Sequence, residues 1–204
     1  MSLPRREVLR LPKPVDVQQA LVEAMARLRP LGDDFALIGG VALAVHGIER
    51  YTKDVDLATT VAQTAAAERS LTDLDLRPLK LGGVSLLTGS GVRVDLIDRR
   101  FEYRGLFEEA IREAKESGLV AQSGAVELPV VALPHLVAMK LIADRPQDEA
   151  DLHALLGKPQ LDYRRARAIV LAHVGPYAAR RLDKRARAAN RSDAPDDYDG
   201  AGSK

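Results

Sequence analysis

Three aspartates that lie next to apolar residues are the side chains with the clearest capacity for chemistry. Asp54 and Asp56 flank Val55 at the start of an apolar run, and Asp95 lies within the run Val92–Ile97. Because side chains alternate along a strand, Asp54 and Asp56 would share one face while Val55 points into the core. Carboxylates on one face repel each other unless a cation lies between them. Mg²⁺ is the natural cation, since it prefers oxygen ligands and commonly combines one or two carboxylates with substrate phosphates.

Each of these acidic signals is weak when it is taken alone. An isolated Asp-x-Asp motif such as Asp54–Asp56 also describes the solvated end of a strand. A single acid such as Asp95 can be an edge charge that prevents aggregation. Aspartate is nevertheless disfavoured inside strands, and three such acids at strand positions fit better as one site.

A pair of glycines precedes the acids. Gly39 and Gly40 follow the apolar run Phe35–Ile38, where a strand-to-helix turn commonly needs a residue that accepts positive φ. No Gly-Lys-Ser/Thr follows, which excludes a Walker loop, and the spacing to Gly47 does not match the dinucleotide fingerprint. The two readings left are a simple turn and a turn whose bare backbone amides, at a helix N-terminus, meet a phosphate.

In chain order, these motifs are Gly39-Gly40, then Arg50-x-Thr52-x-Asp54-x-Asp56, then Val94-Asp95. This order resembles the nucleotidyltransferase superfamily with the polymerase-beta-like fold. More narrowly, it resembles the AbiEii-type and related small nucleotidyltransferase-like proteins of bacteria, in which the segment His46–Arg50 before the threonine is characteristic. The resemblance covers residues 35–100 well and continues more loosely through Leu133–Leu156.

The resemblance implies Mg²⁺ as cofactor, with Mn²⁺ as its substitute, and an NTP as substrate. By position it assigns metal binding and catalysis to Asp54, Asp56 and Asp95, with Asp95 also assisting the attacking hydroxyl. It assigns the triphosphate to the turn at Gly39 and Gly40. The chemistry agrees, because charge must be neutralised on the α-phosphate and on the leaving pyrophosphate, and two metal ions about 3.5–4 Å apart can do both.

Lys140 and Asp148 are the candidate nucleotide-binding residues of the second half. Lys140 lies on or near the apolar face of an expected helix, where it can extend to solvent, pair with Asp144 four residues on, or meet a buried anion. The resemblance implies that it faces the nucleotide phosphates. Asp148 and Asp151 either favour a helix N-terminus or form the basic-Asp-x-x-Asp arrangement of related proteins, in which Gln147 replaces the usual lysine.

Arg50 and Thr52 are weaker candidates for nucleotide binding. Thr52 could hydrogen-bond the turn before Asp54, and Arg50 could pair with an acid, so each also fits a structural role. His46 lies in an apolar turn and is expected to pack rather than to act as a base.

A basic stretch, Arg164–Arg191, precedes an acidic C-terminal end. Such a stretch is commonly a solvated helix face. The alternative is a surface for tRNA or another RNA acceptor, whose binding would depend strongly on salt.

Composition excludes several other classes. The 204 residues carry a net charge of +1 and no cysteine, so disulfides, thiolate zinc sites and cysteine nucleophiles are excluded. Aromatic residues make up 4% of the chain and tryptophan is absent, which argues against a stacking platform for single strands. The N-terminus lacks the apolar core of a signal peptide, and the longest apolar stretch, Val126–Ala143, is interrupted by prolines. We therefore expect no membrane association and a cytoplasmic location.

The pattern of periodicity predicts an α+β fold: a helix from Asp16 to about Leu28, a strand-rich half, then a helical half. The resemblance makes the first part a polymerase-beta-like core with a mixed sheet flanked by helices, over residues 15–132. A C-terminal helical region is expected over 133–190 and a disordered tail over 191–204. Residues 1–14 are expected to form an extended arm.

The favoured function is metal-dependent transfer of a nucleoside monophosphate from an NTP to a hydroxyl of RNA, protein or a small molecule. AbiEii resemblance implies the toxin of a toxin–antitoxin pair, with an antitoxin protein as partner; modification of an antibiotic is a second route. The alternative is a non-catalytic nucleotide- or RNA-binding module on the same fold. A purely structural reading requires Asp54, Asp56 and Asp95 to be exposed and far apart.

Overall fold

The computed structural model describes residues 7–10 and 15–195. The chain divides into two compact units, the first ending at Ala132 and the second beginning at Leu133. The flanking parts of the predicted arm, 1–6 and 11–14, and residues 196–204 of the predicted tail lie outside the described residues.

A mixed sheet forms the centre of the first unit. Within the described residues its spatial order is β2 (Phe35–Ile38), β3 (Asp54–Thr59), β6 (Arg93–Ile97), β5 (Val84–Leu87) and β4 (Leu76–Pro78). Strands β3 and β6 are parallel, and the other neighbours are antiparallel. Side chains alternate between the two faces of β3 and β6 as the sequence predicts. Val55 and Val94 are fully buried, while Asp56 and Asp95 are partly exposed.

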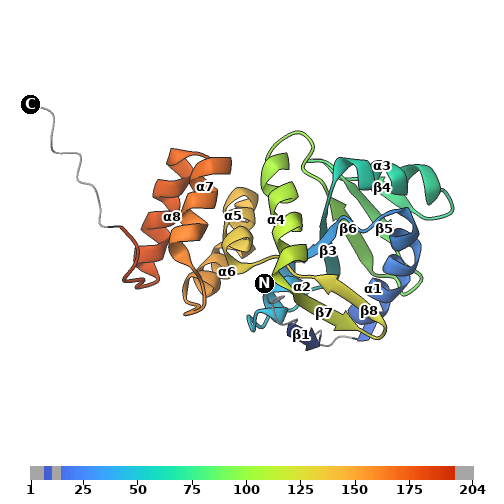
Figure 1. Cartoon of the computed structure of the whole chain (residues 1–204), viewed down its shortest axis with the longest axis horizontal. Helices are drawn as coiled ribbons and strands as arrows, with labels where there is room; N and C mark the ends of the chain where they lie inside the picture. The colour runs from blue at the N-terminus through green and yellow to red at the C-terminus, as the bar shows by residue number, and fades with distance from the viewer. Residues whose placement is uncertain (1–6, 11–14, 196–204) are drawn as a thin grey trace, which may run out of the picture. The chain divides into compact units, whose positions relative to one another are not determined.

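Helices of the first unit support this sheet (Figure 1). They are α1 (Val15–Leu28), α2 (Gly39–Val45), α3 (Val61–Ser70) and α4 (Arg104–Ser117), with a 3₁₀ turn, η1, at Arg29–Leu31. Helices α1 and α4 both contact β3. Their apolar residues at helical spacing, such as Leu21 and Met25 in α1 and Leu106 and Phe107 in α4, are buried.

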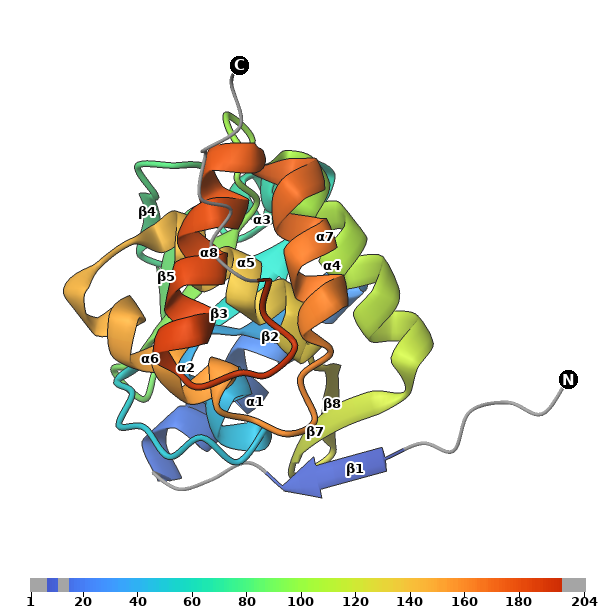
Figure 2. The same ribbon diagram turned by 90° about the vertical axis from the view of Figure 1, so that its left-hand side faces the viewer.

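A small second sheet completes the first unit (Figure 2). It joins β1 (Glu7–Arg10), β7 (Leu119–Ser123) and β8 (Val126–Pro129), with β1 parallel to β7 and β7–β8 antiparallel. Neither β1, which lies within the expected extended arm, nor β7 is predicted from the sequence. Strand β1 depends on pairing with a segment more than a hundred residues away, and β7 has no regular alternation of apolar and polar residues.

The described part of the second unit is helical (Figure 1). Its helices are α5 (Leu133–Ala143), α6 (Pro146–Leu156), α7 (Tyr163–His173) and α8 (Pro176–Ala188). Pro146 and Pro176 occupy the first turns of α6 and α8, where a missing N–H is tolerated. Asp162 caps α7 by accepting a hydrogen bond from the Arg165 amide at 2.9 Å.

The two units together make an α+β fold, as the sequence predicts. Helix α2 begins at Gly39 itself, so the glycine pair lies within the first turn of the helix. Among the described residues, every helix is too short or too polar to cross a membrane.

Candidate active site

The strand register brings the three predicted acids together. Strands β3 and β6 run parallel with Asp56 opposite Asp95 and Asp54 opposite Arg93. Register partners on neighbouring strands lie on the same face, about 4.8 Å apart across the ladder. Asp54, Asp56 and Asp95 therefore share one face and one end of the sheet, which disagrees with the purely structural reading.

Asp95 has the most unusual environment of the three. Burial raises the pKa of its carboxyl, and the charge of Asp54 raises it further, while a hydrogen bond from Ser85 and the charge of Arg93 act in the opposite direction. Its Oδ1 atom is buried and has no hydrogen-bond partner among the described residues. A buried carboxylate oxygen without a partner is costly, and a bound cation would relieve that cost.

The glycine turn lies directly against the acids. Gly39 has φ +64°, and a Cβ atom there would lie 1.9 Å from Oδ2 of Asp56. A Cβ atom on Gly40 would lie 2.9 Å from Cβ of Thr52. Glycine is therefore required at residue 39 by conformation and by space, which the sequence indicates only for conformation.

Thr52 orients the first acid, as the sequence suggests. Its hydroxyl lies 2.9 Å from Oδ1 and 3.0 Å from the backbone carbonyl of Asp54. Arg50, two residues earlier, is half-buried. Nε2 of His46 lies 2.9 Å from the carbonyl oxygen of Val131, which agrees with the packing role expected for this histidine.

Two polar neighbours of Asp95 are missing from the sequence prediction. Ser85 lies opposite Asp95 in the antiparallel β5–β6 pair and is 5% exposed. Arg93 lies on the same face of β6, and its guanidinium donates to Ser85 and to Asp75. The signal for Ser85 is a small polar residue inside the apolar run Val84–Leu87, but only the register connects it to Asp95.

Lys140 and Asp148 form an ion-pair cluster in the second unit. Nζ of Lys140 lies 2.9 Å from Oδ1 of Asp148 and 2.7 Å from Oδ2 of Asp151, and all three side chains are buried. The expectation that Lys140 extends to solvent is wrong, because its side chain is buried. The expectation that it pairs with Asp144 is also wrong, because Asp144 pairs with Arg181 at 2.7 Å.

Asp148 also caps the N-terminus of α6. It accepts hydrogen bonds from the backbone N–H of Arg145 at 3.1 Å and from its Nε at 2.8 Å. Burial alone would raise the pKa of Asp148, but the hydrogen bonds from Arg145 and Lys140 outweigh it and hold the pKa below its ordinary value. This agrees with the predicted place of Asp148 at a helix N-terminus, and adds a tertiary partner to it.

Several cations of the basic stretch have acidic partners. The ion pairs are Arg167–Asp183 at 2.8 Å, Arg181–Asp144 at 2.7 Å, Arg185–Glu149, and Arg191–Asp193 at 2.7 Å. Arg164, Arg180 and Lys184 are exposed. The charge that this stretch offers to RNA is therefore smaller than the sequence alone suggests.

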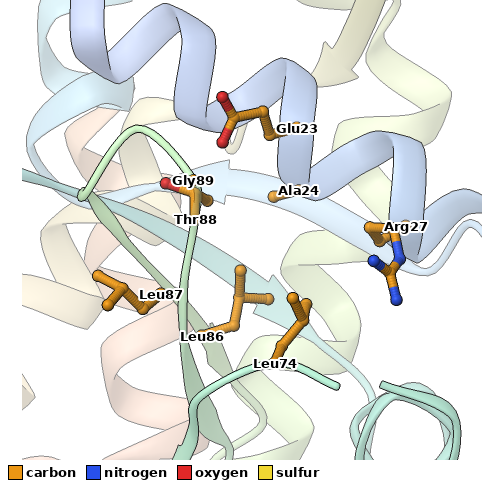
Figure 3. A pocket seen from close by; sticks show the side chains of 8 residues that line it. All are labelled: Glu23, Ala24, Arg27, Leu74, Leu86, Leu87, Thr88 and Gly89. Atoms are coloured by element: carbon orange, nitrogen blue, oxygen red, sulfur yellow. The ribbon is translucent and has the colours of Figure 1, made fainter. Parts of the chain in front are cut away.

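A pocket of about 280 Å³ lies between α1 and β5 (Figure 3). Its wall is largely apolar and includes Leu86 of β5, while α1 contributes the charged Glu23 and Arg27. Both charges have partners, since Arg27 pairs with Asp73 at 2.6 Å and Glu23 accepts from the Ser90 amide at 3.1 Å. None of the clustered aspartates lines this pocket, so we do not assign the chemistry to it.

The donor set fits a divalent metal. Asp54, Asp56 and Asp95 supply carboxylate oxygens, which Mg²⁺ and Mn²⁺ prefer. The buried, unpartnered oxygen of Asp95 is an independent sign that a cation is accommodated there. A mixed sheet that presents three carboxylates beside a glycine turn is the arrangement of a nucleotidyltransferase-like protein.

A family model, the nucleotidyl transferase AbiEii toxin of type IV toxin–antitoxin systems, matches residues 21–200. This match spans most of the chain, and the protein belongs to the AbiEii nucleotidyltransferase family. No curated protein matches the sequence. The crystal structure of an antigenic nucleotidyltransferase-like protein from Paracoccidioides brasiliensis is similar, with 16% identity, a TM-score of 0.46, and coverage of 87% of this chain and 95% of that one.

Proposed function

We propose that the protein is a Mg²⁺-dependent enzyme that transfers a nucleoside monophosphate from an NTP to a hydroxyl acceptor. The observation that carries the proposal is the register of Asp56 with Asp95, next to Asp54, which gathers three carboxylates on one face. Residues 15–132 form the nucleotidyltransferase core in this proposal, and residues 133–190 form an accessory helical region.

The reaction forms a bond between the acceptor oxygen and the α-phosphorus and breaks the bond to the leaving pyrophosphate. Asp54, Asp56 and Asp95 would hold the metal, with Mn²⁺ as a substitute for Mg²⁺. When bound, the metal supplies positive charge at the α-phosphate and at the leaving pyrophosphate.

The chain's own residues bind the nucleotide, orient the carboxylates and accept the proton of the acceptor hydroxyl. Asp95 receives the proton of the acceptor hydroxyl, a role for which a raised pKa is suited, since a base works best with a pKa near the operating pH. In this proposal the turn at Gly39 and Gly40 receives the triphosphate, and Arg50 contacts the phosphates from the following loop. Thr52 fixes the carboxylate of Asp54.

Lys140 and Asp148 enter the proposal as nucleotide-binding residues of the second unit. An ammonium group has three N–H donors, and the ion pairs with Asp148 and Asp151 account for two of them. The third donor is the one assigned to a phosphate oxygen, with Asp148 fixing the direction of the amine.

Family membership supports a toxin whose action is countered by an antitoxin protein. An acceptor of RNA, tRNA in particular, is our first choice, with the exposed Arg164, Arg180 and Lys184 as its contacts. We propose the cytoplasm as the location, because NTPs and such acceptors are found there. Protein and small-molecule hydroxyls are the other acceptor classes to test.

The proposal is tested with NTPs labelled at the α-phosphate. The wild-type chain, Mg²⁺ and total cellular RNA should yield labelled RNA, and chelation of the metal should prevent it. Asp56→Ala should reduce labelling at least about a hundredfold, since it removes one of the three carboxylates that would hold the metal. Labelling that persists in Asp56→Ala would show that the acids are not the catalytic site.

A second candidate is a non-catalytic nucleotide- or RNA-binding module. It is favoured by the two acidic partners that Lys140 already has, and by Gln147 where related proteins have lysine. Calorimetry separates the candidates: NTP binding that needs no Mg²⁺ and is followed by no turnover supports the module, whereas Mg²⁺-dependent binding with release of pyrophosphate supports the enzyme.

A further inference from the structure

We propose that Leu81 and Phe101 lie at the centre of a surface through which two copies of this chain associate about a two-fold axis. They belong to two turns of the first unit, residues 79–83 between β4 and β5 and residues 98–103 between β6 and α4. Neither turn contributes a residue to the acid site, so this inference goes beyond the proposed function and does not depend on it.

The turn at residues 98–103 is fixed by an ion pair and by unusual backbone conformations. Asp98 is 1% exposed, and the guanidinium of Arg100 donates to both of its oxygens, the shortest bond being 2.7 Å to Oδ2. Arg99 and Tyr103 have φ values of +47° and +62°, which residues other than glycine seldom adopt. Strain of this kind persists only where the surroundings fix it, and it is common in functional segments.

The turn at residues 79–83 packs directly against the first one. A Cβ atom on Gly82 would lie 2.6 Å from Oδ1 of Asp98 and 2.8 Å from the backbone nitrogen of Arg100, and Gly82 has φ +104°. Glycine is therefore required by space and by conformation where the two turns meet. Leu81 precedes Gly82 and Phe101 follows Arg100, so each belongs to a residue next to this contact.

These two side chains are large, apolar and exposed. The exposed fraction is 74% for Phe101 and 52% for Leu81. Exposed apolar side chains that are grouped on neighbouring turns mark a protein–protein interaction site more often than single ones do. Because both turns already have a fixed backbone, binding here would not have to order a loop, which lowers the cost of association.

The charges beside the apolar pair indicate which partner fits. Lys80 precedes Leu81 and Glu102 follows Phe101; both charged side chains are exposed, and neither makes an ion pair within the described part of the chain. A two-fold axis between the turns exchanges them, so Lys80 of one copy faces Glu102 of the other at two symmetric places. A purely acidic or purely basic partner would instead place a like charge against one of the two. A second copy of the chain is therefore the partner that this surface complements.

The experiment measures the mass of the full chain by sedimentation equilibrium at increasing protein concentration. The wild type should pass from monomer to dimer. Phe101→Ser should weaken the dimer at least about 30-fold, because central aromatic anchors carry most of the binding energy of an interface, and Leu81→Ser should act in the same direction. Tyr177→Ser is the matched control, since Tyr177 is a 69% exposed aromatic residue of the second unit, and it should keep the wild-type dissociation constant.

Charge reversal tests the two-fold arrangement itself. Lys80→Glu and Glu102→Lys should each weaken the dimer about tenfold, because each change replaces two attractive pairs by two repulsive ones. The chain that carries both changes has opposite charges at both places again, and it should dimerise as the wild type does. All of these side chains are exposed, so the urea midpoints of the variants should stay close to that of the wild type.

Three outcomes would overturn the inference. A wild type that stays monomeric at every concentration would leave the surface to a partner of another kind. A Phe101→Ser variant that dimerises as well as the wild type would show that another face forms the dimer. A double charge reversal that stays as weak as the single changes would refute the pairing of Lys80 with Glu102. Because none of these measurements involves a metal or an NTP, failure here would leave the proposed function standing.

Discussion

Asp95 and Asp148 are a half-buried and a buried carboxylate whose surroundings shift their pKa values in opposite directions. Burial is the largest influence on both, and by itself it raises the pKa of each. In Asp148 the hydrogen bonds from Lys140 and Arg145 reverse that effect, so that its pKa is lowered. In Asp95 the hydrogen bond from Ser85 does not reverse it, and the pKa stays raised.

This difference separates a carboxylate whose interactions are complete from one that still has an interaction to make. Asp148 has a donor for each oxygen and caps a helix, so its charge is compensated within the second unit. Asp95 has a buried oxygen without a donor and another acid, Asp56, as its strand partner. Groups whose pKa is shifted against their charged form, beside like charges, are typical of functional sites. We therefore expect Asp148 to matter first for stability and Asp95 first for activity.

The largest expected effect is on activity, from Asp95→Asn. The change keeps the shape of the side chain but removes the negative charge and the proposed base, so nucleotidyl transfer should fall about 10²-fold to 10⁴-fold. The free energy of unfolding without metal should stay level or rise, because a partly desolvated charge next to Asp54 is lost. Activity assays and urea unfolding of the same preparation measure both. A clear loss of stability in Asp95→Asn would remove the contrast with Asp148.

The second effect is on stability, from Asp148→Asn. Breaking a buried ion pair leaves Lys140 incompletely compensated, so the free energy of unfolding should fall by about 3 kcal/mol. Asp144→Asn is the control, since Asp144 pairs with Arg181 at a partly exposed position and should cost about 1 kcal/mol or less. Urea unfolding followed by circular dichroism measures both. Equal effects of the two changes would mean that the buried cluster contributes no more than a surface pair.

The sequence predicts the strand position of Asp95 better than the ion-pair partners of Lys140, for a physical reason. Strand alternation and apolar flanks place Asp54, Asp56 and Asp95 on strands, and a shared site follows once β3 and β6 are neighbours. The partners of Lys140 lie on a different helix, so helical periodicity, which offers a partner four residues away, leads to the wrong acid.

Other features depend on register or distant pairing and could not be derived locally. Ser85 is connected to Asp95 only by the antiparallel pairing of β5 with β6. Strand β1 exists through its pairing with β7, and neither segment has a clear strand pattern of its own. Gly39 is predicted as a turn residue, but the need for space beside Asp56 appears only in three dimensions.

A third prediction tests whether the acid site depends on the glycine turn. Gly39→Ala forces a Cβ atom into the place of Oδ2 of Asp56, and it adds the strain of φ +64°. We expect Mn²⁺ affinity, measured by calorimetry, to fall about tenfold or more, because the clash displaces Asp56, a proposed metal ligand. About 2 kcal/mol of stability should be lost as well, from strain and displacement.

Gly124→Ala is a matched control for this change. Gly124 has a similar φ of +58° in the same unit, but the nearest atom to its Cβ position is Cγ2 of Val22 at 3.9 Å. Its strain should cost about 1–2 kcal/mol with no change in Mn²⁺ affinity. If both variants keep the wild-type affinity, Asp56 does not need the space that Gly39 provides.

The smallest expected effect is a pH dependence of stability that follows from Asp148. A carboxyl group whose pKa is lower in the folded than in the unfolded state stabilises the fold above its unfolded value, near 3.9 for aspartate, and loses that contribution as pH falls through its folded pKa. The stability gap between wild type and Asp148→Asn should therefore be full at pH 7 and should shrink as the pH is lowered below about 4. Urea unfolding of both proteins over pH 3–7 measures the gap, and the sign is what matters. If the difference in unfolding free energy between the two proteins stays constant down to pH 3, the negative charge of Asp148 does not contribute to stability. The contrast with Asp95 would then rest on hydrogen bonds alone.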